Sequence, residues 1–234
     1  MALPDEVADR ILGEIIRGRF PAESLLPPEG ELTSLYAVSR LTVREAVRIL
    51  RSQNVVAIRR GRGTLVNRPE RWTSLDAVVR SVRAGDSAAN ISERLLEARV
   101  MVEVGAVRLA AVRRSKEDLA ELESCLSEMR SGADAGNVDL FVEADISFHS
   151  VIMRASGNVF VPFMFEPFGN LLIETRRETS TVPRIQQHAI AHHESILESL
   201  VAGDEDGAHD AMETHMKQTR EDLLQYVRNR DTGG

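Results

Sequence analysis

Residues 27–53, PPEGELTSLYAVSRLTVREAVRILRSQ, constrain the fold of this chain more than any other stretch. They predict two short helices separated by a tight turn, with Ser39 capping the second helix. In that helix, apolar residues recur at helical spacing on one face, and arginines crowd its start and its other side. This pattern is typical of a helix-turn-helix, whose second helix enters the major groove of DNA. An ordinary amphipathic helix with solvated arginines is the alternative.

A basic hairpin is predicted directly after this helix. Residues 55–66, VVAIRRGRGTLV, form two short β-branched runs around a turn that contains Gly61 and Gly63, with Arg60 and Arg62 at its tip. Glycines let a backbone approach phosphates closely, and arginine is favoured in a narrow minor groove. The hairpin is therefore interpreted as the wing of a winged helix, against the alternative of a surface hairpin made soluble by its arginines.

The charge distribution supports a partner of opposite sign for the N-terminal part. The whole chain has 234 residues and a net charge of -7, yet residues 1–68 carry 11 arginines against eight acidic residues. Residues 69–234 carry 18 basic and 28 acidic residues, so the positive surplus lies with the predicted helix-turn-helix. A single cysteine, Cys125, no apolar run of membrane length and no signal peptide predict a cytoplasmic protein without membrane contact.

The remainder of the chain is helical in pattern. Leu75, Val78, Val79 and Val82 predict a linking helix that ends at Gly85. Six further helices are predicted, joined by short Gly, Asp or Ser breaks, which is the arrangement of an antiparallel bundle. Their predicted ranges are 91–113, 116–131, 137–155, 159–177, 183–201 and 204–228.

Four polar residues fall on apolar faces of these helices. Asp145 and His149 lie one turn apart on one helix, and His193 and His215 lie on two later helices. Burying three imidazoles and a carboxylate is costly unless something pairs them, and a divalent metal such as zinc, nickel or manganese would do so. The spacing alone leaves a second interpretation open, in which the histidines are hydrogen-bonded within an ordinary core.

Two stretches resemble one known family. The run VSRLTVREAVRIL with the glycine-rich hairpin resembles the winged helix of the GntR family of bacterial transcription regulators. The runs LLEARVMVEVGAVRLAA, DISFHSVIMRASGN, HHESIL and AMETHM resemble the all-helical FCD sensing domain of its FadR branch.

For DNA binding, the resemblance implies Ser39, Arg40, Thr42 and Arg44, together with Gly61 or Gly63 of the wing. The basic pattern adds Arg48, Arg60 and Arg62 to these candidates. Gly30 departs from the family, which usually has an arginine there, so one customary DNA contact is missing.

The resemblance also implies a metal and an effector. Asp145, His149, His193 and His215 match the family's metal ligands, for which we expect zinc, or else nickel or manganese. Family members sense small organic acids, and Arg99 occupies the position that pairs with the acid's carboxylate. A salt bridge from Arg99 to Glu103, one turn away, is the alternative role. Asn158 and Arg176 are further candidates for facing the same cavity.

Together these observations predict a mainly α protein with three parts. Residues 1–69 form a winged helix-turn-helix of three helices and a hairpin, residues 70–86 a linker helix, and residues 87–234 an antiparallel helical bundle. The predicted function is that of a homodimeric repressor, not an enzyme, that binds a palindromic DNA operator under control of a small carboxylate at the metal site. A metal-responsive regulator is one alternative, and a metal-dependent hydrolase or hydratase is another.

Overall fold

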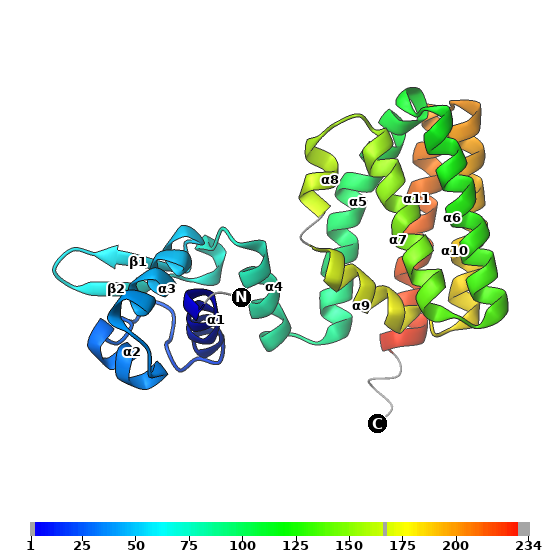
Figure 1. Ribbon diagram of the computed structural model, residues 1–234. Coiled ribbons are helices and arrows are strands. Elements are labelled where there is room, and N and C mark those ends of the chain that lie inside the picture. The colour runs from blue at the N-terminus through cyan, green and yellow to red at the C-terminus, as the bar shows by residue number, and fades with distance from the viewer. Residues whose placement is uncertain (1–2, 166–167, 229–234) are drawn as a thin grey trace. The chain divides into compact units, whose positions relative to one another are not determined.

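The computed structural model describes residues 3–165 and 168–228, and the chain divides into two compact units, Met1–Ser87 and Ala88–Gly234. Each unit has its own hydrophobic core, and each is described by itself below. The first unit contains α1 (Leu3–Ile16), α2 (Glu29–Tyr36), α3 (Arg40–Ser52), β1 (Val56–Arg59), β2 (Gly63–Val66), a 3-10 turn (Pro69–Arg71) and α4 (Leu75–Gly85). The predicted winged helix-turn-helix is therefore present (Figure 1).

Local chemistry sets the turn between α2 and α3. Ala37 adopts a left-handed conformation with φ of 54°, and its backbone N–H donates to the carbonyl of Thr33, which ends α2. Ser39 then accepts a hydrogen bond from the backbone N–H of Thr42 and begins α3. The two helices therefore meet at a tight corner, as the sequence predicts.

The core of the first unit lies between its helices and the base of the hairpin. Val7 and Ile11 of α1 pack with Val43 and Leu50 of α3. Ala77 of α4 is buried in the same core. The helix expected to link the two parts thus packs within the first unit.

The second unit consists of helices throughout its described part. The long helices α5, α6, α7, α10 and α11 lie alongside one another, while the short α9 crosses near the ends of α5 and α7 (Figure 1). The elements are α5 (Ala88–Arg113), α6 (Lys116–Ala135), α7 (Val138–Ala155), α8 (Phe160–Phe165), α9 (Gly169–Thr179), α10 (Pro183–Ala202), α11 (Glu205–Asp222) and a π-helical turn (Leu223–Arg228). The predicted antiparallel bundle is confirmed.

One predicted helix is wrong. Residues 159–177 were expected to form a single helix, but two separate helices, α8 and α9, occupy this stretch. Gly169 falls inside the expected helix but begins α9, and glycine is disfavoured in a helix interior. Residues 166 and 167 themselves, and 229–234 of the expected second domain, lie outside the described residues.

The inner faces of α5, α7, α10 and α11 converge on one polar region inside the bundle. Phe148, Ile196, Leu200 and Met212 are almost wholly buried around it.

Among the described residues, no helix is both long enough and apolar enough to cross a membrane.

Candidate nucleic-acid interface and metal centre

The first turn of α3 is built around Ser39 and Thr42. The backbone N–H of Thr42 donates to Oγ of Ser39 at 3.1 Å, and the two hydroxyls lie 2.8 Å apart. Thr42 is only 9% exposed, so its hydroxyl serves the helix cap in this structure. Arg40, by contrast, is exposed on the same turn.

Two further arginines line the exposed face of α3. Arg44 pairs with Glu29 of α2, and Arg48 pairs with Glu45 one turn back, each at 2.8 Å. Both arginines keep about two thirds of their side-chain surface exposed, at 65% and 66%. Exposed ion pairs of this kind contribute at most about 1 kcal/mol, so either arginine can leave its partner for a phosphate at little cost.

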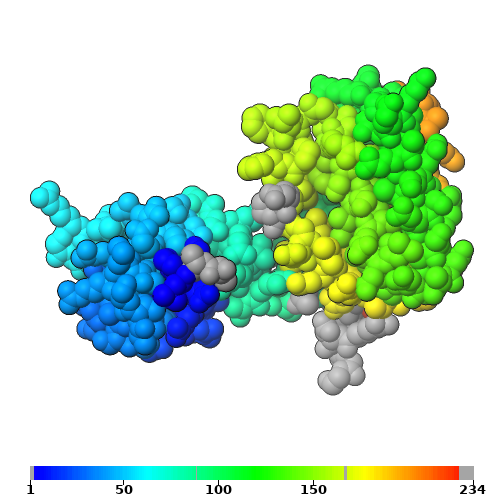
Figure 2. All heavy atoms as spheres, viewed as in Figure 1, coloured from blue at the N-terminus to red at the C-terminus, as the bar shows by residue number. Residues whose placement is uncertain are grey.

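The hairpin projects from the first unit as a narrow ribbon (Figures 1 and 2). Arg59 faces Gly63 at the end of the antiparallel ladder, and the tip consists of Arg60, Gly61 and Arg62. Gly61 and Gly63 have φ values of 74° and 117°, which only glycine adopts freely. A hollow of about 930 Å³ is lined by residues of α2, α3 and the hairpin. Arg44 and Arg48 of α3 and Arg62 of the wing therefore border one concave surface, whereas Arg40 and Arg60 are not among its lining residues.

The second unit contains a cluster of three buried histidines. His149 of α7, His193 of α10 and His215 of α11 each offer a ring nitrogen, and these nitrogens lie within 4.8 Å of one another. The three residues are 4%, 0% and 1% exposed. Three different helices, α7, α10 and α11, thus bring the three predicted histidines to one point.

Two carboxylates flank the histidine cluster, and each is also paired with a buried arginine. An oxygen of Asp145 lies 3.5 Å from Nε2 of His193, and the other lies 3.0 Å from Nε of Arg176. Asp145 therefore adjoins the cluster, although the group of mutually close ligand atoms contains the histidines alone.

Glu103 forms the second pair. Its Oε2 lies 2.6 Å from Nδ1 of His149, and its Oε1 accepts a hydrogen bond from Nε of Arg99 at 2.7 Å. Sequence reasoning considered Glu103 only as an alternative partner for Arg99 and missed its contact with His149. The i,i+4 spacing from Arg99 was the one sequence signal for a role of Glu103. That spacing could not show which residue of α7 would contact Glu103.

The electrostatics of the cluster follow from burial. Burial lowers the pKa of His193 to about 3 and holds that of His215 well below its usual range, so both rings are neutral. Burial alone would raise the pKa of Glu103, but Arg99 and His149 outweigh it and hold the carboxyl ionised. The pKa of Asp145 is lowered as well, because Arg176 outweighs the effect of burial.

Several of these atoms lack hydrogen-bond partners within the part of the chain that the structure describes. They are both oxygens of Asp145, both nitrogens of His149, Nε2 of His193, both nitrogens of His215 and Nη2 of Arg176. Some of these atoms still have a close polar neighbour: Nδ1 of His149 lies 2.6 Å from Glu103, and the two Asp145 oxygens lie 3.0 Å from Arg176 and 3.5 Å from His193. Buried polar atoms are almost always paired, so such a group indicates a missing ligand. Three imidazoles and a carboxylate are ligand types that fit a divalent metal.

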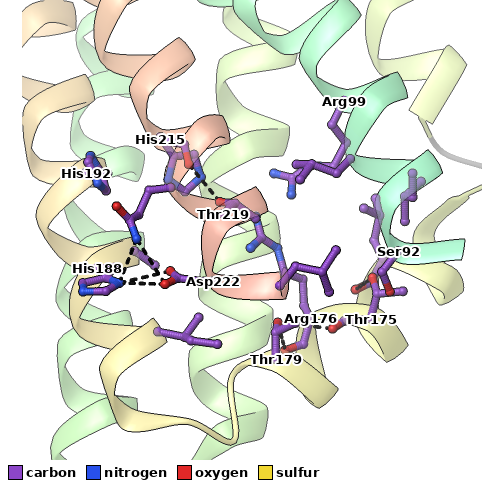
Figure 3. A pocket seen from close by; sticks show the side chains of 17 residues that line it. Ser92, Arg99, Thr175, Arg176, Thr179, His188, His192, His215, Thr219 and Asp222 are labelled. Atoms are coloured by element: carbon purple, nitrogen blue, oxygen red, sulfur yellow. Dashed lines mark hydrogen bonds and ion pairs between the residues drawn. The ribbon is translucent and has the colours of Figure 1, made fainter. Parts of the chain in front are cut away.

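A cavity of about 40 Å³ lies beside the histidine cluster (Figure 3). Arg99, Arg176 and His215 line it, as does a separate, partly buried group in which His188 and Gln218 both contact the carboxylate of Asp222. Arg99 and Arg176 thus face the cavity, as expected from the sequence, and Arg99 also forms the salt bridge considered as its alternative role.

The expectation for Asn158 is wrong. This residue is not among those that line the cavity. Its side chain instead accepts a hydrogen bond from the backbone N–H of Phe160 at 3.1 Å, at the start of α8. A short polar side chain after a helix is often used in this way to cap the next one.

A winged helix-turn-helix joined to a helical unit with a buried, histidine-lined cavity defines a DNA-binding regulator with an effector-binding domain. The chain belongs to the GntR family of bacterial transcription regulators. Residues 3–66 match the family described as "Bacterial regulatory proteins, gntR family", and residues 94–218 match the FCD domain.

Curated relatives and a solved structure agree with this assignment. The chain is 30% identical to the "Putative L-lactate dehydrogenase operon regulatory protein" of Escherichia coli K12, over 97% of this chain and 91% of that protein. It is 29% identical to the transcriptional regulator LutR of Bacillus subtilis, over 83% of this chain and 89% of that protein. The structure of Streptococcus agalactiae GntR is 26% identical with a TM-score of 0.52, covering 93% of this chain and 99% of that one.

Proposed function

We propose that this GntR-family regulator is a homodimeric repressor whose binding to a palindromic operator is controlled by a small organic acid at a divalent-metal site. The observation that carries the proposal is the set of unsatisfied nitrogens on three buried histidines beside two cavity-lining arginines. A structural core would pair such groups within the protein.

The proposal assigns DNA binding to residues 1–69, a linking role to residues 70–86 and effector binding to residues 87–234. Arg40, Arg44 and Arg48 of α3 contact phosphates and base edges, with Ser39 and Thr42 holding the first turn. Arg60 and Arg62 enter the minor groove from the wing, where Gly61 and Gly63 permit close approach. Gly30 has open space around it, so its small size is not imposed by packing.

His149, His193 and His215 would hold the metal, together with Asp145. A divalent cation held by these residues would supply a positive charge that can bind a carboxylate oxygen. Zinc is the first expectation because imidazole nitrogen and carboxylate oxygen are its usual ligands, with nickel or manganese as substitutes.

Arg99 and Arg176 would orient the acid. Arg99 contacts Glu103 through Nε and Nη2, so Nη1 is the nitrogen that is left for a ligand. Nη2 of Arg176 has no hydrogen-bond partner among the described residues and is a second donor for the acid. A cavity of about 40 Å³ holds roughly three water-sized groups at about 10–15 Å³ each. This size favours a compact acid of few carbons.

The control of DNA binding would depend on two arrangements of the dimer. The acid can shift the protein between them only by the difference between its affinities for the two. A metal-responsive regulator uses the same residues and differs in that metal alone changes operator affinity. The hydrolase or hydratase alternative gains no support from the relatives, which are transcription regulators.

The DNA-binding part is tested by selecting bound sequences from a random duplex pool with the purified full-length protein. Enrichment of a two-fold palindrome is the expected result, and no enrichment at low or moderate salt would overturn it.

Elemental analysis of tag-free protein and of His149→Ala tests the metal. We expect about one divalent metal per chain in the wild type, and a wild type without bound metal would contradict the proposal.

A further inference from the structure

Leu41 is an exposed apolar side chain on the face of α3 that also carries Arg44 and Arg48. Leu41 is 70% exposed, although it belongs to the first turn of the helix. Residues three and seven positions later, Arg44 and Arg48, share its face because an α-helix has 3.6 residues per turn. Exposed leucines are common on protein surfaces and need no explanation when they occur singly. Leu41 differs from such surface leucines because it lies in the first turn of the helix that is proposed to enter the major groove.

The first turn of α3 has few residues with which to reach DNA. Thr42 is buried at 9% exposure, and its hydroxyl lies against that of Ser39, which caps the helix. Arg44 forms an ion pair with Glu29 of α2. Arg40 and Leu41 are therefore the side chains of this turn that project most freely from the helix. The N-terminal residues of a recognition helix are those that contact base edges in the major groove.

The C5-methyl group of thymine is the one methyl group that the four bases present in the major groove. Guanine, adenine and cytosine present mainly hydrogen-bond donors and acceptors there, which a leucine cannot satisfy. Placing Leu41 against a polar base edge would leave that edge without its water and without a new partner. Contact with a methyl group instead buries apolar surface on both partners.

We infer that Leu41 reads the methyl group of a thymine, once in each half-site of the operator. The inference rests on the proposed DNA binding through α3. It assigns sequence preference at one base pair per half-site to an apolar contact, whereas the neighbouring arginines supply polar contacts.

The first test repeats the selection from the random duplex pool with Leu41→Ala. We expect the wild type to enrich thymine at one symmetry-related pair of positions, and Leu41→Ala to lose that preference while retaining the rest of the palindrome. Leu3→Ala is the matched control, because Leu3 is a 51% exposed leucine on α1 of the same unit. It should give the wild-type motif.

The second test removes the methyl group alone. Each conserved thymine of the selected operator is replaced in turn by deoxyuridine, symmetrically in both half-sites, and the dissociation constant is measured. At the position read by Leu41, each lost methyl contact should weaken binding by the wild type about fourfold, so the operator substituted in both half-sites should bind about 16-fold more weakly. Leu41→Ala should show no change. No sensitive position in the wild type, or equal sensitivity in Leu41→Ala, would overturn the inference. If no motif is enriched by the wild type at all, the proposed DNA binding fails instead.

Discussion

Replacing Glu103 with glutamine removes a negative charge that two buried groups share. The carboxylate is 2% exposed and lies 2.7 Å from Nε of Arg99 and 2.6 Å from Nδ1 of His149. Removing one partner of a buried ion pair costs about 3–5 kcal/mol, because the remaining charge is left uncompensated. Glutamine keeps an oxygen that can accept from Arg99, so we expect the free energy of unfolding to fall by about 3 kcal/mol, the lower end of this range.

The same substitution should weaken metal binding. A carboxylate beside a metal-ligating histidine fixes the orientation of its ring, and removing such a partner typically lowers metal affinity by about 10–100-fold. Urea denaturation followed by circular dichroism measures the first effect on metal-free protein. Competition with a chromophoric chelator measures the second.

Glu143→Gln is the matched control for Glu103→Gln. Glu143 is an exposed carboxylate on α7, and its replacement should change the free energy of unfolding by no more than about 0.5 kcal/mol. If Glu103→Gln unfolds like this control and binds metal as tightly as the wild type, the role given to Glu103 is refuted. A loss of stability with unchanged metal affinity would limit Glu103 to its pairing with Arg99.

Three further predictions concern pH, packing and the helix cap. Because the folded pKa values of His193 (about 3) and His215 lie below the usual 6.5, metal-free protein should keep its stability above pH 6.5 and lose it on acidification. The unfolded chain then binds two more protons, so urea denaturation between pH 7.5 and 5.5 should show a slope of up to about 2.7 kcal/mol per pH unit. Gly132→Ala should lower the melting temperature, because its Cβ would lie 2.8 Å from a backbone nitrogen of α7, whereas Gly105→Ala, which meets open space, should raise it slightly. Ser39→Ala should cost about 1 kcal/mol in denaturation experiments and weaken operator binding, and an unchanged stability would contradict the capping role.

The elements that the sequence predicted best are those fixed by local chemistry. Ser39 and the apolar spacing of α3 specify where the recognition helix begins and which face it buries. Gly61 and Gly63 specify a turn that other residues adopt with strain. The linking helix ends at Gly85, as expected from its apolar pattern.

The candidate site was predictable only in part. Histidines on apolar faces could be recognised from helical periodicity, because each belongs to a strongly patterned helix. The contact between Glu103 and His149 joins α5 to α7 and depends on how those helices are rotated against each other, which periodicity does not determine. The pairing of His188 with Asp222 likewise joins residues of α10 and α11 that carry no shared local signal.

The inward orientation of Thr42 shows a different limit. Its place two residues after Arg40 predicts a contact with DNA, but its hydroxyl lies 2.8 Å from that of Ser39 and the residue is only 9% exposed. A sequence pattern identifies the turn that meets the groove, whereas the direction of each side chain depends on the packing of that turn.

Operator binding titrated with a panel of small carboxylic acids tests the central claim most directly. Metal-loaded wild type and His149→Ala are compared on the selected operator, each with and without acid. We predict that at least one compact acid changes the operator affinity of the wild type by about 5–150-fold and leaves that of His149→Ala unchanged. If no acid changes the affinity of the loaded wild type, or if the variant responds equally, control of DNA binding through this site is contradicted.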